Sequence, residues 1–281
     1  MDNITALRCD LEYSISADTH FCFNLQAVRG YGQQVLQESL QLTPEVPLQS
    51  FEDARSGNRF FRCDALPGRL RVRYDARVAL LREAPDTSLP ECPVKALPHE
   101  VLHYLMPSRY CQSDVMARAA QHLFGQVAPG YQRVAHICEW IRQNTAYQIG
   151  VSTPLTTAQE VYLQRAGVCR DFAHLGITFC RALNIPARLV VGYVHFDEPP
   201  QDFHAIFEAW LGDRWVMFDP TGLVQAHRIV RVSTGRDAKD TAFATLFGAV
   251  VMTRMELQVN EDDSPPVDVP DPVQATVLLA A

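Results

Sequence analysis

Residues 167–183 read GVCRDFAHLGITFCRAL, and this stretch decides what kind of fold the chain adopts. Its apolar residues recur at intervals of three and four positions, a spacing that places them on one face of an α-helix. A helix with one apolar face packs on a core, so the pattern predicts a buried helix with Cys169 in or just before its first turn. Gly167 gives the chain a flexible lead into that helix. The apolar positions are Phe172, Leu175, Gly176, Phe179 and Leu183.

The start of a helix is a favourable place for a nucleophilic cysteine. Its unpaired N–H groups and partial positive charge favour the thiolate form and can bind an oxyanion as it develops. Cys169 is therefore predicted as the nucleophile in preference to Cys180, which lies three turns further along on the apolar face. The backbone N–H of Cys169 is the first candidate for an oxyanion hole, and the Tyr147 side chain is a further one.

A thiolate nucleophile needs a base, and the base needs a partner that orients it. Two strand-like runs, residues 203–211 and 214–221, are joined by Gly-Asp at 212–213, a dipeptide suited to a two-residue turn. Such a turn places His204 and Asp219 on one face as diagonal neighbours, with Cβ atoms roughly 7 Å apart. A three-residue turn would place them on opposite faces. The candidate catalytic residues are thus Cys169, His204 and Asp219.

Upstream, the first 80 or so residues show short runs of alternating apolar and polar residues, which predict an antiparallel, sandwich-like β domain. The four prolines between 85 and 98 favour an extended linker. The predicted division is 1–82 for the β domain, 83–98 for the linker, 99–259 for the catalytic core and 260–281 for an acidic, proline-rich, flexible tail. The predicted strands cover 7–15, 19–28, 33–42, 58–63 and 69–80, and the first two core helices cover 113–124 and 131–145.

Composition narrows the function further. With 281 residues, the chain is long enough for two folded domains. Its composition, 47% hydrophobic and 20% charged, excludes a disordered protein. Its first residues lack the apolar stretch of a signal peptide, and no run approaches the roughly 20 apolar residues of a membrane span. The net charge of -7 gives no reason to expect nucleic acid or a membrane as partner. The eight cysteines lack paired spacings, so we expect reduced thiols and a cytoplasmic location.

One motif favours a different enzyme class. Residues 99–103 read HEVLH, which on an α-helix places two imidazoles on one face for zinc and leaves Glu100 as base. The extended pattern has no third ligand here, and Pro98 and Pro107 leave room for only about two turns. A zinc peptidase at His99 and His103 is therefore the lesser alternative.

The motifs together resemble the transglutaminase-like superfamily, whose fold is similar to that of papain. The resemblance rests on GVCRDFA at 167–173, NIPAR at 184–188, His204-Ala205 and FDPT at 218–221. Residues 25–79 resemble the β domain that precedes this core in bacterial transglutaminase-like proteins. The resemblance implies an α+β fold and a Cys169, His204 and Asp219 triad that forms a thioester on an amide or peptide substrate.

The same resemblance leaves several outcomes open. Members include peptidases, amidases, transglutaminases and non-catalytic peptide-binding modules, so the acyl acceptor is either water or an amine. We expect a protein or peptide substrate, no metal and no cofactor. His195, with Asp197 in a proline-flanked loop, is a rival candidate for the base. Asp171 is expected to stabilise the helix N-terminus. Trp210 is expected to pack against Trp215 across the hairpin.

Overall fold

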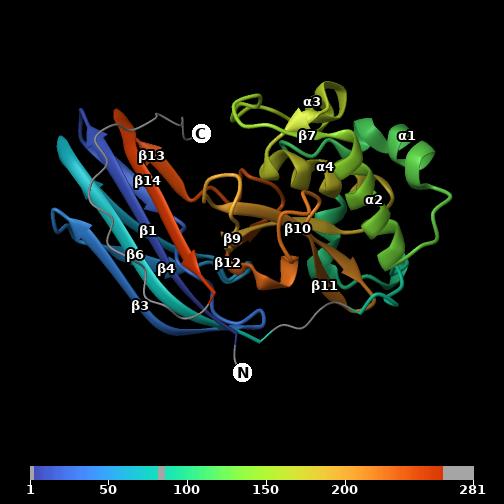
Figure 1. Cartoon of the computed structure of the whole chain (residues 1–281), viewed down its shortest axis with the longest axis horizontal. Helices are drawn as coiled ribbons and strands as arrows, with labels where there is room; N and C mark the ends of the chain where they lie inside the picture. The colour runs from blue at the N-terminus through green and yellow to red at the C-terminus, as the bar shows by residue number, and fades with distance from the viewer. Residues whose placement is uncertain (1–2, 82–85, 262–281) are drawn as a thin grey trace.

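The computed structural model describes residues 3–81 and 86–261, which form a β-sandwich beside an α+β core (Figure 1). Part of the predicted linker, residues 83–85, and the predicted flexible tail from residue 262 onward lie outside the described residues. The strands are β1 Asn3–Ile15, β2 Thr19–Phe23, β3 Gln33–Thr43, β4 Gln49–Glu52, β5 Arg59–Ala65, β6 Gly68–Leu80, β7 Ala146–Tyr147, β8 Ala166–Gly167, β9 Ala187–Tyr193, β10 His204–Leu211, β11 Arg214–Phe218, β12 Val230–Gly235, β13 Ala244–Phe247 and β14 Val250–Asn260. The α-helices are α1 Ser113–Phe124, α2 Tyr131–Asn144, α3 Ala158–Gln164 and α4 Cys169–Ala182, and the 3-10 helices are η1 Val94–Ala96, η2 His99–Leu105 and η3 Ala226–Arg228.

The β-sandwich consists of two antiparallel sheets with strand orders β14-β1-β6-β3 and β13-β2-β5-β4. Strand β6 shows how the alternation builds the core, because every second side chain points into the sandwich. These inward residues are buried, while the arginines between them are partly or fully exposed. The inward residues of β6 are Leu70, Val72, Tyr74, Ala76 and Val78.

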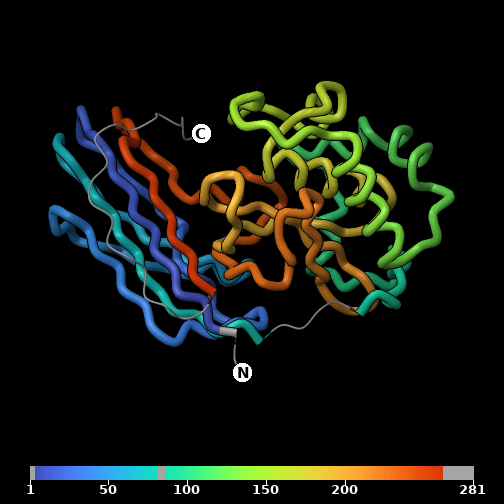
Figure 2. The backbone as a smooth tube through the Cα atoms, in the orientation of Figure 1, coloured from blue at the N-terminus to red at the C-terminus, as the bar shows by residue number. Residues whose placement is uncertain are grey.

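The chain returns to this sandwich after it has built the core. Strand β13 pairs with β2, and β14 runs antiparallel to β1 over almost its whole length, as the red and dark blue tubes show in Figure 2. The predicted core, 99–259, had included both strands. Local patterns predict that a segment is a strand but not which strand it pairs with, and this pairing joins residues as distant as Leu7 and Val259.

The α+β core is a four-stranded antiparallel sheet, β11-β10-β9-β12, with its helices on one face (Figure 1). Helix α4 packs directly on β10 and is surrounded by the other three α-helices. This contact requires Gly176, because a Cβ atom there would lie 2.5 Å from the ring of Phe207. The predicted α+β fold with an N-terminal β domain is confirmed.

Two side-chain amides of the β domain clamp the outer edge of β12. Gln33 donates to the carbonyl of Arg231 at 3.0 Å and accepts from its N–H at 2.8 Å. Asn58 does the same for Thr234, at 3.0 and 2.8 Å. The amides take the place of a neighbouring strand, so this edge is covered and the two domains are held together.

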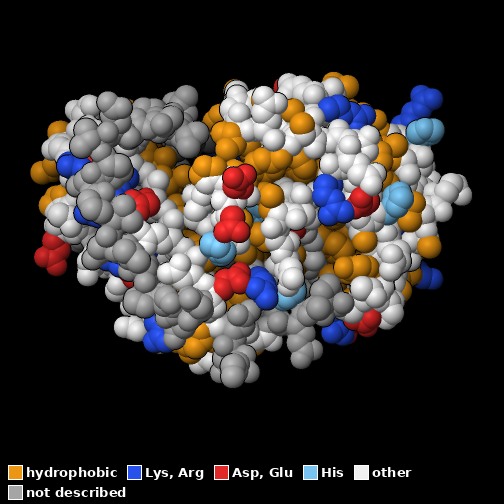
Figure 3. Space-filling model, in the orientation of Figure 1, with side chains coloured by type: hydrophobic (Ala, Val, Ile, Leu, Met, Phe, Trp, Pro, Cys, Tyr) orange, Lys and Arg blue, Asp and Glu red, His pale blue; other side chains and the backbone are white. Residues whose placement is uncertain are grey.

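The surface agrees with a chain of mixed charge. On the face drawn in Figure 3, lysine and arginine side chains are scattered among acidic and hydrophobic ones. In the described ranges, 3–81 and 86–261, no helix has the length and apolar character needed to cross a membrane.

Candidate active site

Cys169 is the first residue of helix α4, as the sequence pattern predicts. The turn before it is fixed by Asp171, a buried residue whose carboxylate accepts a hydrogen bond from the Val168 N–H at 2.9 Å. Gly167 is needed because a Cβ atom there would lie 2.7 Å from the Cβ of Asp171. The role of this glycine is therefore close packing rather than the flexibility that was expected.

The downstream hairpin has the register that a two-residue turn predicts. Leu211 pairs with Arg214, and Phe207 pairs with Phe218 further along the strands. His204 is the first residue of β10, and Asp219 follows the last residue of β11. His204 Nε2 lies 3.1 Å from Asp219 Oδ2, so the hairpin brings the predicted base and its orienting group into contact.

Asp219 is held in place by the turn that follows it. Its Oδ1 accepts hydrogen bonds from the Thr221 N–H at 2.9 Å and from the Thr221 hydroxyl at 2.7 Å, and its Oδ2 accepts from the Val224 N–H at 3.1 Å. Although burial favours the neutral acid, the hydrogen bonds from His204 and Thr221 lower the pKa of Asp219. The side chain is 2% exposed, so the carboxylate is rigid, charged and shielded.

Cys169 is the third residue of the predicted triad, and it lies beside the imidazole of His204. Burial would lower the pKa of His204, but hydrogen bonds and charge interactions with Asp219 and Cys169 raise it to about 10. With Nε2 bonded to Asp219, Nδ1 is the ring nitrogen left to face the thiol. The Cys169 Sγ lies 3.9 Å from the Phe203 carbonyl oxygen. Cys169 as a residue is partly exposed, whereas the His204 side chain is 1% exposed, so the nucleophile is the more accessible of the two.

Tyr147 lies beside the cysteine, although it has no motif of its own. Burial and the neighbouring Cys169 raise the pKa of its phenol, which places the two side chains close together. Strand β7 carries Tyr147 and pairs in parallel with β8, which ends two residues before Cys169. This short pairing is the reason that the two residues meet.

The structure keeps the rival residues away from this arrangement. His195 lies in the loop after β9 with its side chain 49% exposed, 3.4 Å from Asp197 and bonded to the Val259 carbonyl. His99 and His103 lie on η2, a 3-10 helix, which places residues four apart about 120° from each other around the axis. Among the described residues, no three His, Cys, Asp or Glu side chains gather in a way that could hold a metal ion.

The structure confirms the predicted pairing of the two tryptophans and the burial of Cys180. Trp210 and Trp215 pair in register with ring centroids 5.3 Å apart. All eight cysteines are free, and Cys180 is fully buried. The sequence reasoning missed Phe196, whose ring centroid lies 5.7 Å from that of His204, and no pattern marks this loop residue. It also missed Glu208, although a charged residue among the apolar residues 205–211 of β10 was a usable signal.

Comparisons with known proteins agree with this geometry. Residues 117–220 match the transglutaminase-like superfamily, and residues 5–88 match the N-terminal domain of bacterial transglutaminase. A crystal structure of a protein from Cytophaga hutchinsonii, described as a candidate cysteine protease, is 37% identical, with a TM-score of 0.89. The similarity covers 98% of this chain and 96% of that one.

Curated relatives match over a shorter part of the chain. An uncharacterized protein of Mycobacterium leprae is 30% identical over 149 residues, 49% of this chain and 52% of that protein. An uncharacterized protein of Mycobacterium tuberculosis is 32% identical over 143 residues, 46% of this chain and 45% of that protein. The chain thus spans about half the length of these relatives.

Proposed function

Because the chain belongs to the transglutaminase-like superfamily, we propose that it is a thiol-dependent hydrolase of amide or peptide bonds in a protein or peptide substrate. The observation that carries this proposal is the arrangement of His204, which is bonded to Asp219 at 3.1 Å and faces the thiol of Cys169. The relative described as a candidate cysteine protease supports hydrolysis over transfer to an amine. We also propose that the protein is located in the cytoplasm.

The proposed reaction has two halves. The Cys169 sulfur attacks the carbonyl carbon of the substrate, and the C–N bond of the resulting adduct breaks as His204 gives a proton to the leaving amine. This leaves a thioester on Cys169. Water then attacks the thioester while His204 takes its proton, the carboxylic product leaves, and the sulfur is regenerated. An amine in place of water would give transamidation by the same steps.

Two neighbouring groups have proposed roles in these steps. Asp219 keeps the imidazole in one orientation and stabilises its charged form, because it is itself fixed by Thr221. The Cys169 N–H, at the start of α4, is the proposed donor to the oxyanion of the tetrahedral adduct. The Tyr147 hydroxyl, which lies beside Cys169, is the proposed second donor.

A peptide screen tests the proposal on the full chain. Wild type, Cys169→Ala and the control Cys92→Ser would be incubated with a peptide library, with and without a primary amine, and the products identified by mass spectrometry. We expect cleavage or deamidation in wild type and Cys92→Ser and none in Cys169→Ala. Turnover that persists in Cys169→Ala would refute the proposed nucleophile. Peptide binding without any turnover would favour the non-catalytic module instead.

A further inference from the structure

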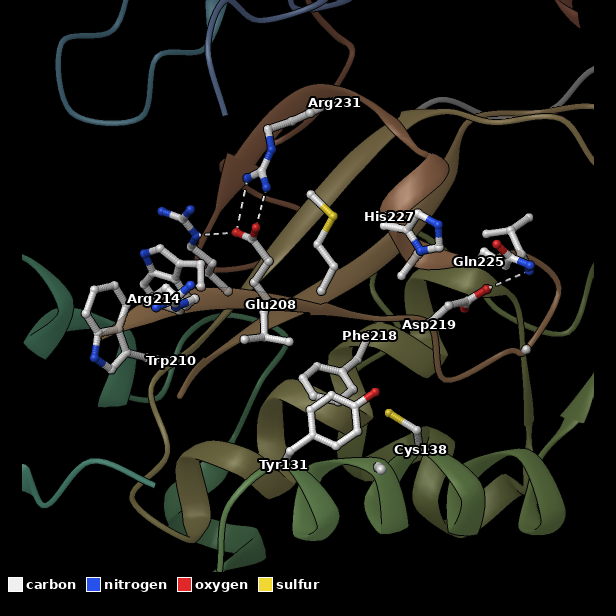
Figure 4. A pocket seen from close by; sticks show the side chains of 18 of the residues that line it. Tyr131, Cys138, Glu208, Trp210, Arg214, Phe218, Asp219, Gln225, His227 and Arg231 are labelled. Atoms are coloured by element: carbon white, nitrogen blue, oxygen red, sulfur yellow. Dashed lines mark hydrogen bonds and ion pairs between the residues drawn. The ribbon is translucent and has the colours of Figure 1, made fainter. Parts of the chain in front are cut away.

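The surroundings of the triad differ from one side to the other. Asp219 borders a cavity of about 960 Å³ (Figure 4). At the other end of this cavity, Glu208 accepts hydrogen bonds from Arg188 Nε at 2.7 Å and from Arg231 Nη1 at 3.0 Å, and the side chains of both arginines are buried. Neither the nucleophile nor the base lines the cavity, so the packing that fixes these two residues lies elsewhere.

Phe203, the residue before His204, connects the catalytic strand to the core of the β-sandwich. Its residue is 9% exposed and belongs to the hydrophobic cluster formed mainly by β1, β2, β5 and β6. Two positions further along the chain, Ala205 belongs instead to the cluster that packs around α4. His204 therefore lies where the chain passes from the core of one domain to the core of the other.

The β domain fixes both aromatic neighbours of the Phe203 ring. The centroid of this ring lies 5.0 Å from that of Tyr193 and 5.0 Å from that of Phe243, with which it is stacked at 17°. The Tyr193 hydroxyl donates to the Leu25 carbonyl at 2.7 Å. The Asn24 N–H donates to the Phe243 carbonyl at 2.8 Å. Two consecutive residues of the β domain thus hold the two rings that Phe203 contacts.

The backbone of Phe203 reaches the nucleophile directly. Its carbonyl oxygen lies 3.9 Å from Cys169 Sγ, within range of a weak hydrogen bond from the protonated thiol. A planar peptide bond links the same carbonyl to His204, so a shift of the Phe203 backbone would move both the carbonyl and the imidazole relative to the sulfur. The imidazolium favours the thiolate, and this effect weakens as the two charges separate.

Resting on the proposed function, we propose that Phe203 is a positioning residue for Cys169 and His204, and that the β domain sets the reactivity of the nucleophile through it. The path runs from residues 24–25 through the two rings that they hold to the ring of Phe203, and from its backbone to the thiol and the imidazole. The β domain then contributes to catalysis rather than only adjoining the catalytic core.

Alkylation of Cys169 in the full chain measures this positioning without any substrate. Wild type, Phe203→Ala and the control Phe61→Ala would be labelled with iodoacetamide at pH 7, and the rate at Cys169 followed by peptide mass spectrometry. Phe61 is fully buried in the same sandwich core and stacks on Phe23, so its replacement leaves a comparable cavity there. We expect Phe203→Ala to slow labelling about threefold, because the imidazole moves away from the sulfur, and Phe61→Ala to keep the wild-type rate.

Two milder variants complete the test. Phe203→Leu keeps much of the apolar volume and should label at a rate closer to wild type than to Phe203→Ala. Tyr193→Phe removes only the hydroxyl that bonds to the Leu25 carbonyl, so the fold should persist while labelling slows about twofold. Circular dichroism and urea midpoints would show that each variant is folded under the labelling conditions.

Three outcomes would overturn the proposal. The first is a wild-type rate in folded Phe203→Ala, and the second is equal slowing in Phe61→Ala, which would show a general loosening of the sandwich. The third is a wild-type rate in Tyr193→Phe, which decides the matter if Phe203→Ala does not fold. The peptide screen tests the proposed function separately: absence of turnover in wild type would refute hydrolysis, while the labelling rates would still report how Cys169 is positioned.

Discussion

Replacing Glu208 by glutamine removes the one negative charge between the buried guanidinium groups of Arg188 and Arg231. The change keeps the size of the side chain and leaves one oxygen able to accept a hydrogen bond. The two cations would remain buried without an anion, which is the costly way to break an ion pair in a protein interior. We therefore expect Glu208→Gln to lower the free energy of unfolding substantially.

The magnitude follows from the pKa of this carboxyl. Burial favours its neutral form, but the two arginines lower the pKa from 4.5 to about 2. At about 1.4 kcal/mol for each pKa unit, the charged form contributes about 3 kcal/mol to stability at pH 7. Because the pKa is lower in the folded chain, this contribution is present above pH 4.5 and is lost as the pH falls through about 2. At pH 3 about 1.4 kcal/mol of it remains.

Equilibrium urea unfolding, followed by circular dichroism at pH 7 and pH 3, measures this directly. The stability difference between wild type and Glu208→Gln should be about 3 kcal/mol at pH 7 and should shrink by about 2 kcal/mol at pH 3. Glu139→Gln, which removes a 40% exposed carboxylate paired with Arg142, serves as the control and should cost less than about 1 kcal/mol. A loss below about 1 kcal/mol at pH 7, or the same loss at both pH values, would refute the reasoning.

Three further predictions concern the triad, the contact between the two domains and the packing of β12 on β9. His204 has its pKa raised to about 10 and so carries its charge at pH 7. Because this cation favours the neighbouring thiolate as an ion pair, His204→Ala should slow the labelling of Cys169 by iodoacetamide at pH 7 about tenfold. Equal rates in both proteins would exclude the ion pair. Gln33→Ala should destabilise the fold by about 1 to 3 kcal/mol because it leaves the buried N–H of Arg231 without its partner, while the Arg231 carbonyl keeps its bond from the Val28 N–H. Gln34→Ala at the exposed neighbouring position should change little, and similar urea midpoints would contradict the clamp. Gly192→Ala places a Cβ 2.1 Å from the Val230 carbonyl and should cost about 1 to 3 kcal/mol in thermal unfolding, and an unchanged melting temperature would show that β12 can move aside.

The features that sequence predicted well are those set by local chemistry. The Gly-Asp turn at 212–213 fixed the register of its hairpin, so the contact between His204 and Asp219 followed from counting residues. The helix after Gly167 was predicted because its apolar period and first turn lie within one short segment. In both places the deciding interactions are made between residues that are close in the chain.

Features that depend on distant pairing were not predictable in this way. Residues 24–28 were expected to continue a strand, but β2 ends at Phe23, and the Asn24 N–H bonds to the Phe243 carbonyl just before β13. The short strand β4 was missed because its side chains are all exposed and show no alternation. The ion cluster around Glu208 draws Arg188 and Arg231 from two other strands, and no local pattern specifies that meeting.

The pairing of β14 with β1 has a consequence for how the protein is made. On a translating ribosome β1 to β6 emerge early, yet β1 remains an open edge until β14 has left the exit tunnel, and an open edge invites pairing with other chains. Charged side chains such as Asp10 and Glu12 on β1 protect that edge during the wait. The α+β core, whose last strand β12 ends at Gly235, is synthesised in the interval, so the sandwich is completed only after the whole core has been made.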